Sequence, residues 1–315
     1  MVAQADDKGY LFRIGFLGNS TATLEANLIG PFREGLRERG YVEGENLQIV
    51  YRWAEGNYKR LPSLIQELLA QKVALIVTAG TPATLAVKKA TRTVPLVMVA
   101  VGDPVGTGIV PSLSKPGGNI TGLTSISTEM DGKRLQLLME IAPDVSYVAV
   151  LWNSVSPLQV LAEKRVREAA GILGVKVLSL GVQNTKEIEH AFATTMREQP
   201  DALLVLADRL FLHNRQLIMD FAKQQRLPGV HAYRELVEVG GLMSFGPSYP
   251  GMHRRAAYFV DKILRGYRPA SLPVERPDKF ELVINLETAQ ALDLSIPQGV
   301  LLRATELIRP TPRAQ

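Results

Sequence analysis

The sequence predicts an α/β protein of two doubly wound, Rossmann-like lobes joined by several chain crossings. Three observations favour this fold class: a length of 315 residues, an alternation of short apolar strands with amphipathic helices, and a repeat of that alternation in the second half. One compact core rarely extends beyond about 250–300 residues, so two lobes are expected. With 46% hydrophobic and 21% charged residues, the composition is that of a globular protein.

The first half shows the alternation clearly. Short runs of aliphatic and β-branched residues predict strands, and apolar residues three and four positions apart predict helices. In the first predicted helix, Ile29, Phe32 and Leu36 share one face, and Gly40 follows as a stop signal. Strands are expected at residues 13–17, 47–51, 74–78 and 96–101, and helices at 27–39, 60–71 and 82–90.

The second half repeats this arrangement. Residues 147–154 resemble residues 13–20 at an offset of 134 positions, and both segments end in Asn-Ser. Residues 202–208 resemble residues 74–80 at an offset of 128 positions. Two similar offsets in the same order indicate two copies of one α/β lobe.

Loop-rich segments suggest where the chain passes between the lobes. Glycine and proline cluster at 102–108 and 115–119, and a glycine-flanked strand at 240–247 precedes a helix at 252–265. A short strand at 280–285 begins the last unit and a helix follows it. We expect an N-terminal lobe of residues 10–121 plus about 248–275, a C-terminal lobe of about 122–247 plus 276–310, and a ligand cleft between them.

Composition excludes several classes of protein. The net charge is +5, but Lys and Arg are interleaved with Asp and Glu, so no nucleic-acid partner is expected. Cysteine is absent, which excludes disulfides and thiolate chemistry. No apolar run reaches the ~18 residues of a membrane span, so a soluble chain is expected. Residues 3–7 resemble the end of a removed signal peptide followed by a polar mature start; an ordinary N-terminus is the alternative.

No enzyme signature is present, and neither a cofactor nor a metal is expected. The four histidines lack ligand spacing, and no Gly-rich loop followed by Lys-Ser/Thr is found. The stretch 15–18 is only a fragment of a dinucleotide fingerprint. A transcriptional regulator would need an N-terminal helix-turn-helix, and the first strand near Arg13 leaves no room for one.

Several segments in this order resemble a known family. The chain is similar to the periplasmic components of ABC transport systems of the tryptophan/tyrosine-binding type, which have the type I periplasmic binding protein fold. The resemblance extends from about Arg13 to Pro310, and its motifs are residues 32–36, 40–44, 102–105, 115–122, 240–247 and 279–286. It departs from the family at Ser248-Tyr249, where an acidic residue is common, and at 231–233.

The resemblance implies an extracytoplasmic receptor that closes on a small molecule, an amino acid and possibly an aromatic one. An ABC permease in the inner membrane is then its partner, a monomer is expected, and a signal peptide would direct it to the periplasm. Hinges are expected near Thr121, Phe245 and residues 276–278. A ligand sensor of the receptor type, or a regulator-like core without a DNA-binding domain, is the alternative.

Ligand contacts are expected at the carboxyl ends of the strands, where open α/β sheets bind ligands. Asp208 is the candidate partner of a ligand ammonium, and the hydroxyl of Thr81 with the following helix terminus is the candidate carboxylate site. Each has a structural alternative: a helix cap for Asp208 and Thr81, a turn for Asp103, and lobe packing for the aromatic residues. The expected ligand-binding residues are Asn19, Ser20, Thr21, Gly80, Thr81, Pro82, Asp103, Trp152, Asn153, Ser154, Asp208, Tyr233 and Phe245.

Overall fold

The computed structural model describes residues 11–309, so the expected signal-peptide remnant at residues 3–7 lies outside the described part. The chain divides into two compact units. Unit 1 comprises the described residues up to Thr124 together with Tyr249–Arg276, and unit 2 comprises Ser125–Ser248 together with the described residues from Pro277 onward. Within residues 11–309, no helix combines the length and the hydrophobicity that crossing a bilayer requires.

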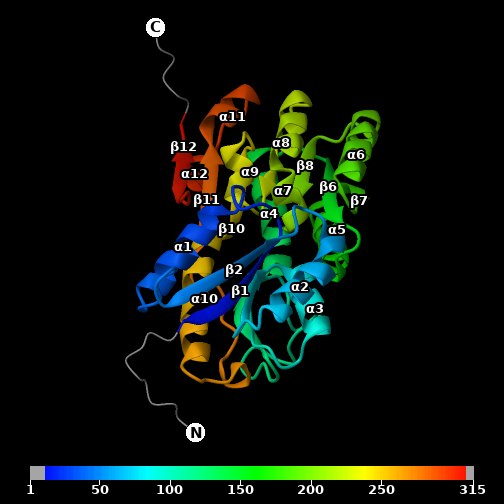
Figure 1. Cartoon of the computed structure of the whole chain (residues 1–315). Coiled ribbons are helices and arrows are strands. Elements are labelled where there is room, and N and C mark those ends of the chain that lie inside the picture. The colour runs from blue at the N-terminus through cyan, green and yellow to red at the C-terminus, as the bar shows by residue number, and fades with distance from the viewer. Residues whose placement is uncertain (1–10, 310–315) are drawn as a thin grey trace. The chain divides into compact units, whose positions relative to one another are not determined.

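A five-stranded sheet forms the centre of unit 1 (Figure 1). Its strands are β1 (Phe12–Gly18), β2 (Leu47–Trp53), β3 (Ile76–Ala79), β4 (Leu96–Val101) and β5 (Ile120–Thr124), and its helices are α1 (Ala26–Arg37), η1 (Tyr58–Arg60), α2 (Leu61–Ala70), α3 (Thr81–Ala90), α10 (Tyr249–Leu264) and η2 (Pro269–Ser271). The strand order is β2-β1-β3-β4-β5, and every neighbouring pair is parallel.

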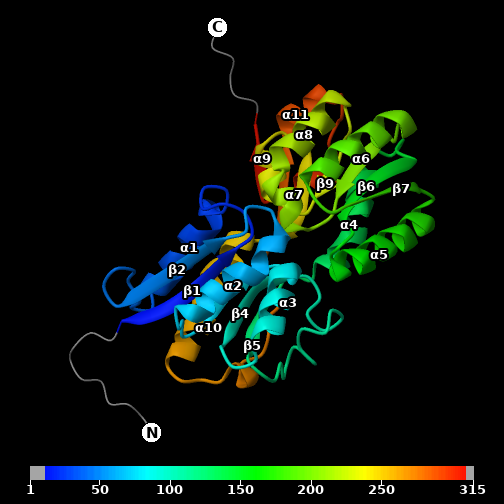
Figure 2. The same ribbon diagram turned by 45° about the vertical axis from the view of Figure 1, so that its right-hand side comes forward.

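Helices cover both faces of this sheet. Successive residues of a strand point to opposite faces, so one strand contacts helices on both sides. Phe16 of β1 packs against Phe32 of α1 with ring centroids 5.7 Å apart. The next residue, Leu17, joins the core on the other face, under α2 and α3. Helix α10 comes from a distant part of the chain, yet it packs along α1 in both views (Figures 1 and 2).

Unit 2 contains two sheets, of order β7-β6-β8 and β12-β11-β10-β9. A backbone hydrogen bond of 3.0 Å from Leu203 to Pro228 connects them. Strand β11 is antiparallel to β10, and the other strand pairs are parallel. The strands are β6 (Tyr147–Asn153), β7 (Lys176–Val182), β8 (Ala202–Val205), β9 (Val230–His231), β10 (Met243–Pro247), β11 (Phe280–Asn285) and β12 (Glu306–Ile308).

Eight helices surround these strands within the described residues, and α4 and α5 pack together (Figure 2). They are α4 (Ser127–Ile141), α5 (Pro157–Leu173), α6 (Thr185–Glu198), α7 (Arg209–His213), α8 (Arg215–Gln224), α9 (Arg234–Glu238), α11 (Leu286–Ala291) and α12 (Gln298–Leu301).

The predicted fold class is confirmed, and the predicted repeat is visible in the strand order. β6 lies between β7 and β8 as β1 lies between β2 and β3, and β1 and β6 are the two segments that the sequence comparison paired. The second copy differs beyond β8, where the strand β11 reverses direction.

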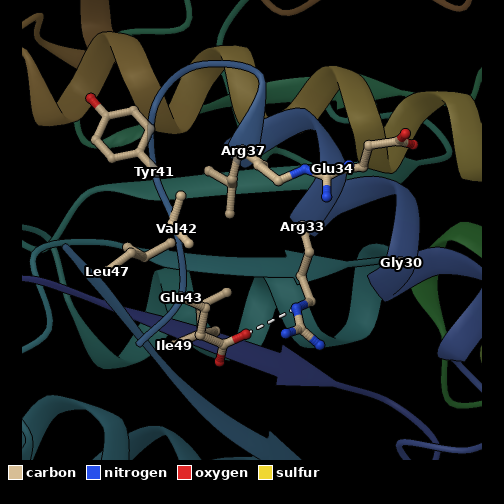
Figure 3. A pocket seen from close by; sticks show the side chains of 10 residues that line it. Gly30, Arg33, Glu34, Arg37, Tyr41, Val42, Glu43, Leu47 and Ile49 are labelled. Atoms are coloured by element: carbon tan, nitrogen blue, oxygen red, sulfur yellow. Dashed lines mark ion pairs between the residues drawn. The ribbon is translucent and has the colours of Figure 1, made fainter. Parts of the chain in front are cut away.

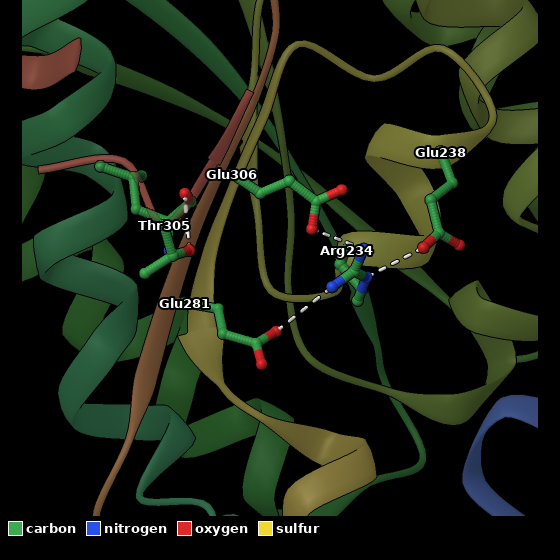
Figure 4. A network of polar contacts seen from close by, with 6 residues as sticks. Arg234, Glu238, Glu281, Thr305 and Glu306 are labelled. Carbon is green, nitrogen blue, oxygen red and sulfur yellow. Dashed lines mark hydrogen bonds and ion pairs between the residues drawn. The ribbon is translucent and has the colours of Figure 1, made fainter. Parts of the chain in front are cut away.

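An arginine connects the last strands of unit 2 (Figure 4). Arg234 of α9 donates to Glu238 and to Glu306 of β12, at 2.9 Å each, and its third nitrogen lies 3.8 Å from Glu281 of β11. Beside it, the hydroxyl of Thr305 both accepts from and donates to the backbone of Leu282. These contacts hold β12 against β11.

One residue near a chain crossing has an unusual backbone conformation. Ile126, the second residue of unit 2 and the N-cap of α4, has a φ of 46°. A left-handed conformation is strained for a β-branched side chain. Such strain persists only where the surrounding structure imposes it.

Two glycines of α1 provide a matched test of the α1–α10 contact. A Cβ at Gly35 would lie 2.5 Å from the carbonyl oxygen of Arg254, whereas a Cβ at Gly30 would meet no atom within 4 Å beyond its chain neighbours and its own helix backbone. We predict that Gly35→Ala lowers the free energy of unfolding by about 1–3 kcal/mol through overpacking. Gly30→Ala should cost less, because its Cβ would meet only the ring of the next residue, Pro31. Urea unfolding of both variants measures the difference, and equal stabilities would contradict the close approach of α1 and α10.

Candidate functional site

In unit 1, two unsatisfied polar side chains lie at the ends of neighbouring strands. Asn19 follows β1 and Thr81 follows β3, and these strands are paired and parallel. Asn19 is 1% and Thr81 2% exposed. Among the described residues, neither the Oδ1 of Asn19 nor the hydroxyl of Thr81 has a hydrogen-bond partner. A buried polar atom without a partner costs about 1–3 kcal/mol.

The rest of the Asn19 environment is well ordered by hydrogen bonds. Its Nδ2 donates to the carbonyl of Ala79 at 2.8 Å, which joins the ends of β1 and β3. The carboxylate of Glu25 accepts from the backbone N–H groups of Asn19 at 2.9 Å and Ser20 at 2.6 Å. The bond to Ala79 orients the side-chain amide of Asn19, and the bonds to Glu25 hold the backbone that carries it.

Thr81 does not cap helix α3. The N-cap is Gly80, with a φ of 78°, and no side chain caps this terminus. Thr81 and Pro82 are already inside the first turn. The Thr81 hydroxyl therefore does not act as a helix cap, which was the alternative stated from the sequence.

In unit 2, the end of β6 has a comparable set of unsatisfied atoms. Asn153 is completely buried; its Oδ1 accepts from Val155 at 3.1 Å, and its Nδ2 has no partner among the described residues. Ser156 and Gln159, at the start of helix α5, each also have a buried polar atom without a hydrogen-bond partner among the described residues. The sequence analysis missed both residues. The Nε2 of Gln159 donates to Ala207 at 2.9 Å, which connects this group to the end of β8.

The other predicted residues of unit 2 have varied contacts. Asp208 accepts from the N–H of Leu210 at 2.9 Å and so caps α7. The guanidinium of Arg209 lies 5.4 Å from the ring centre of Tyr233. Phe245 stacks on Phe280 with ring centroids 6.1 Å apart.

The aromatic ring of Trp152 lies over β7. Its Nε1 donates to Ser179 at 2.8 Å, and a Cβ at Gly181 would lie 3.0 Å from its ring. Ser154, two residues later, donates its N–H to the carbonyl of Val182 at 2.9 Å. These are the contacts of a packing residue, the alternative stated for Trp152.

Two other predicted residues also have local partners. Asp103 accepts from the N–H of Gly106 at 2.8 Å and forms a turn. The hydroxyl of Thr21 accepts from Leu24 at 3.3 Å. The structure thus brings Asn19 and Thr81 together in unit 1 and Asn153 and Asp208 to neighbouring strands of unit 2.

Buried charges in unit 2 add to its polarity. Burial raises the pKa of Asp131 to about 6, although Arg134 beside it lowers this pKa. Burial, and then the charge of Arg134, lowers the pKa of His231 to about 3, so this histidine is neutral near pH 7. The sequence analysis singled out neither Asp131 nor Arg134, because nothing in their spacing indicates that the two side chains are buried.

Two grooves on unit 1 lie elsewhere, beside α1 and β2. Figure 3 shows the first, of about 390 Å³, in which Arg33 and Glu43 form an ion pair of 2.9 Å. The second, of about 480 Å³, shares this pair and extends to the stacked rings of Tyr51 and Trp53. Neither groove is lined by a predicted ligand-binding residue. Residues 11–309 contain no cluster of His, Asp and Glu side chains that could hold a metal ion.

Comparisons with known proteins identify the family. Residues 22–308 match the family model of the ABC transporter substrate binding protein. The chain is 28% identical over 263 residues to a tyrosine-binding protein of Clostridioides difficile (strain R20291), covering 84% of this chain and 75% of that protein.

Two solved structures are similar over nearly the whole chain. An ABC domain in complex with L-Trp from Streptococcus pneumonia has 26% identity and a TM-score of 0.87, covering 95% of this chain and 100% of the other. A conserved domain protein of Vibrio cholerae has 28% identity and a TM-score of 0.88, covering 94% and 99%. Solute-binding proteins below 25% identity share the fold alone, which is the predicted type I periplasmic binding protein fold.

Members of this family are solute-binding proteins, not enzymes, and they work outside the cytoplasm with an ABC permease. The match covers all the strands of both units except β1, and the overall resemblance stated from the sequence is confirmed. The chain belongs to the ABC transporter substrate-binding protein family.

Proposed function

We propose that this chain binds an aromatic amino acid and presents it to an ABC permease, with units 1 and 2 acting as two lobes that close on the ligand. Two relatives support the choice of ligand, since one is named for tyrosine binding and another contains L-Trp. We further propose a periplasmic monomer, delivered by a signal peptide and without a nucleic-acid partner.

The observation that carries this proposal is the set of unsatisfied atoms at strand ends in both units. An amino acid presents a carboxylate that accepts hydrogen bonds and an ammonium that donates them. The free Oδ1 of Asn19 is an acceptor, the Nδ2 of Asn153 is a donor, and the hydroxyl of Thr81 can be either. A zwitterion therefore supplies partners of both kinds.

Asp208 supplies the negative charge in this proposal. Its carboxylate is 4% exposed, and a charge-assisted hydrogen bond to an ammonium is about twice as strong as a neutral one. Tyr233 follows β9 and Phe245 lies in the neighbouring strand β10, and we assign both to the ligand side chain. We leave Asp103 and Trp152 out of the proposed site, because Asp103 forms a turn and Trp152 packs over β7. Ser20, Thr21, Gly80, Pro82 and Ser154 complete the proposed site.

A panel of amino acids tests the ligand class. We expect L-Trp, L-Tyr or L-Phe to raise the melting temperature, whereas L-Leu, L-Glu and L-Lys should leave it nearly unchanged. A ligand at 100 times its Kd stabilises the folded form by about 2.7 kcal/mol, which a thermal-shift assay detects. Stabilisation by a non-aromatic amino acid alone would show that the aromatic assignment is wrong.

Thr81→Val tests the unit 1 contact. The variant removes a hydroxyl that has no described partner, so affinity for the ligand should fall about tenfold, as expected for a hydrogen bond to a charged group. The matched control is Thr84→Val, because the Thr84 hydroxyl of the same helix donates to Gly80 at 2.8 Å. The control should lose stability and keep its affinity in calorimetry; the same affinity in both variants would remove Thr81 from the site.

Asp208→Asn separates the charge of this residue from its helix cap. Asparagine caps helices as well as aspartate does, so the melting temperature should change little while affinity falls more than tenfold. Asp201→Asn is the control, because Asp201 accepts from the backbone of Ser146 and Tyr147 at 2.9 Å each, at the opposite end of β6. Calorimetry that finds full affinity in Asp208→Asn would leave Asp208 with its capping role only.

A further inference from the structure

Helix α4 contains an ion pair that is sealed inside unit 2. Asp131 is 1% and Arg134 0% exposed, and they are one turn apart. The guanidinium donates through Nη1 to Asp131 and through Nε to the carbonyl of Phe245 at 2.7 Å. Within the described chain, the Nη2 of Arg134 and the Oδ2 of Asp131 have no partner.

The attraction between Asp131 and Arg134 does not compensate for the cost of burying their charges. Burial raises the pKa of Asp131 to about 6 despite the adjacent guanidinium, so desolvation outweighs the attraction between the two charges. A guanidinium stays charged in proteins and has five N–H donors in one plane. Buried polar groups nearly always have partners, so an unused charged donor in a sealed position indicates a molecule that completes it.

The guanidinium lies near the end of strand β9, beside the middle of β10. These strands are parallel, and the Phe245 carbonyl that accepts from Arg134 belongs to β10. A Cβ at Gly246 would lie 3.6 Å from Nη2 and 2.6 Å from the carbonyl oxygen of Ala232, the residue after β9. Glycine thus lets the backbone of β10 pass close to both Ala232 and Nη2, at the edge where open α/β sheets bind their ligands.

No second positive charge comes from the histidine nearby. His231 of β9 is 2% exposed, and burial with the charge of Arg134 lowers its pKa to about 3. Near pH 7 it is therefore a neutral side chain next to a fixed cation. An anion at this strand end would meet the guanidinium as its charged donor.

We propose that the Nη2 of Arg134 donates a hydrogen bond to the carboxylate of the ligand, and that Asp131 positions the guanidinium for this contact. The inference rests on the proposed function, since it assigns the carboxylate of the bound amino acid. It makes Arg134 the ligand-binding residue that distinguishes an amino acid from its amide or from the corresponding amine. The ammonium remains with Asp208.

The test compares ligands that differ only in the carboxylate. Affinities of wild type and Arg134→Gln are measured by calorimetry for L-Trp and L-tryptophanamide, and for L-Tyr and L-tyrosinamide. We expect wild type to prefer the acid, and Arg134→Gln to reduce the acid-to-amide ratio of affinities at least tenfold. A residue that only stabilises the fold would weaken both ligands equally and leave this ratio unchanged.

Two further variants keep the test sharp if Arg134→Gln folds poorly. Arg134→Lys keeps the charge without the planar fork, so its ratio should fall between those of wild type and Arg134→Gln. Arg303→Gln is the matched control, because Arg303 forms an ion pair of 2.6 Å with Glu140 of the same helix α4 at the surface. Its ratio should equal that of wild type.

The outcomes separate the inference from the proposed function. If wild type binds the aromatic amino acid and both Arg134 variants keep the wild-type acid-to-amide ratio, Arg134 is a structural residue. Only this inference is then overturned. If wild type binds a different amino acid, the aromatic assignment is wrong, and the same comparison with that amino acid and its amide decides the role of Arg134. A wild type that binds no amino acid overturns both.

Discussion

The hydrogen bond from the Asn19 amide to the carbonyl of Ala79 joins the ends of two parallel strands, and much of the candidate site depends on it. Parallel neighbours end at the same edge of a sheet, so their terminal polar groups are buried next to one another. Apolar side chains pack on both faces of the sheet beneath them, and these side chains offer no hydrogen-bond partner. The polar atoms of the candidate site therefore lack hydrogen-bond partners because of where the fold places them.

Much of the fold could be predicted because it follows from periodicity. The alternation of strands and helices and the paired Asn-Ser strand ends are local signals, and the order of strands around β1 and β6 agrees with them. The helix terminus at Thr81 was also visible in the sequence. The sequence does not show whether the Thr81 hydroxyl caps this helix, because the same residues allow the N-cap to be Gly80 or Thr81.

The features that could not be predicted from the sequence depend on side-chain direction. Trp152 ends a strand, but its ring turns sideways over β7 because Gly181 provides space there. Arg134 belongs to helix α4, which was not predicted from the sequence, and its long side chain reaches Phe245 of β10. Neither fact has a signature in spacing or composition, since both depend on which atoms come from distant strands.

The strained backbone of Ile126 has a consequence for the energetics of a two-state receptor. A residue held in a sparsely populated conformation costs about 1–3 kcal/mol, and Ile126 is two residues beyond Thr124, where the first segment of unit 1 ends. If that strain is present in only one of two conformers, their population ratio shifts by roughly five- to 150-fold. Backbone strain at Ile126 would then adjust the affinity, because the fraction of binding-competent molecules scales the apparent Kd.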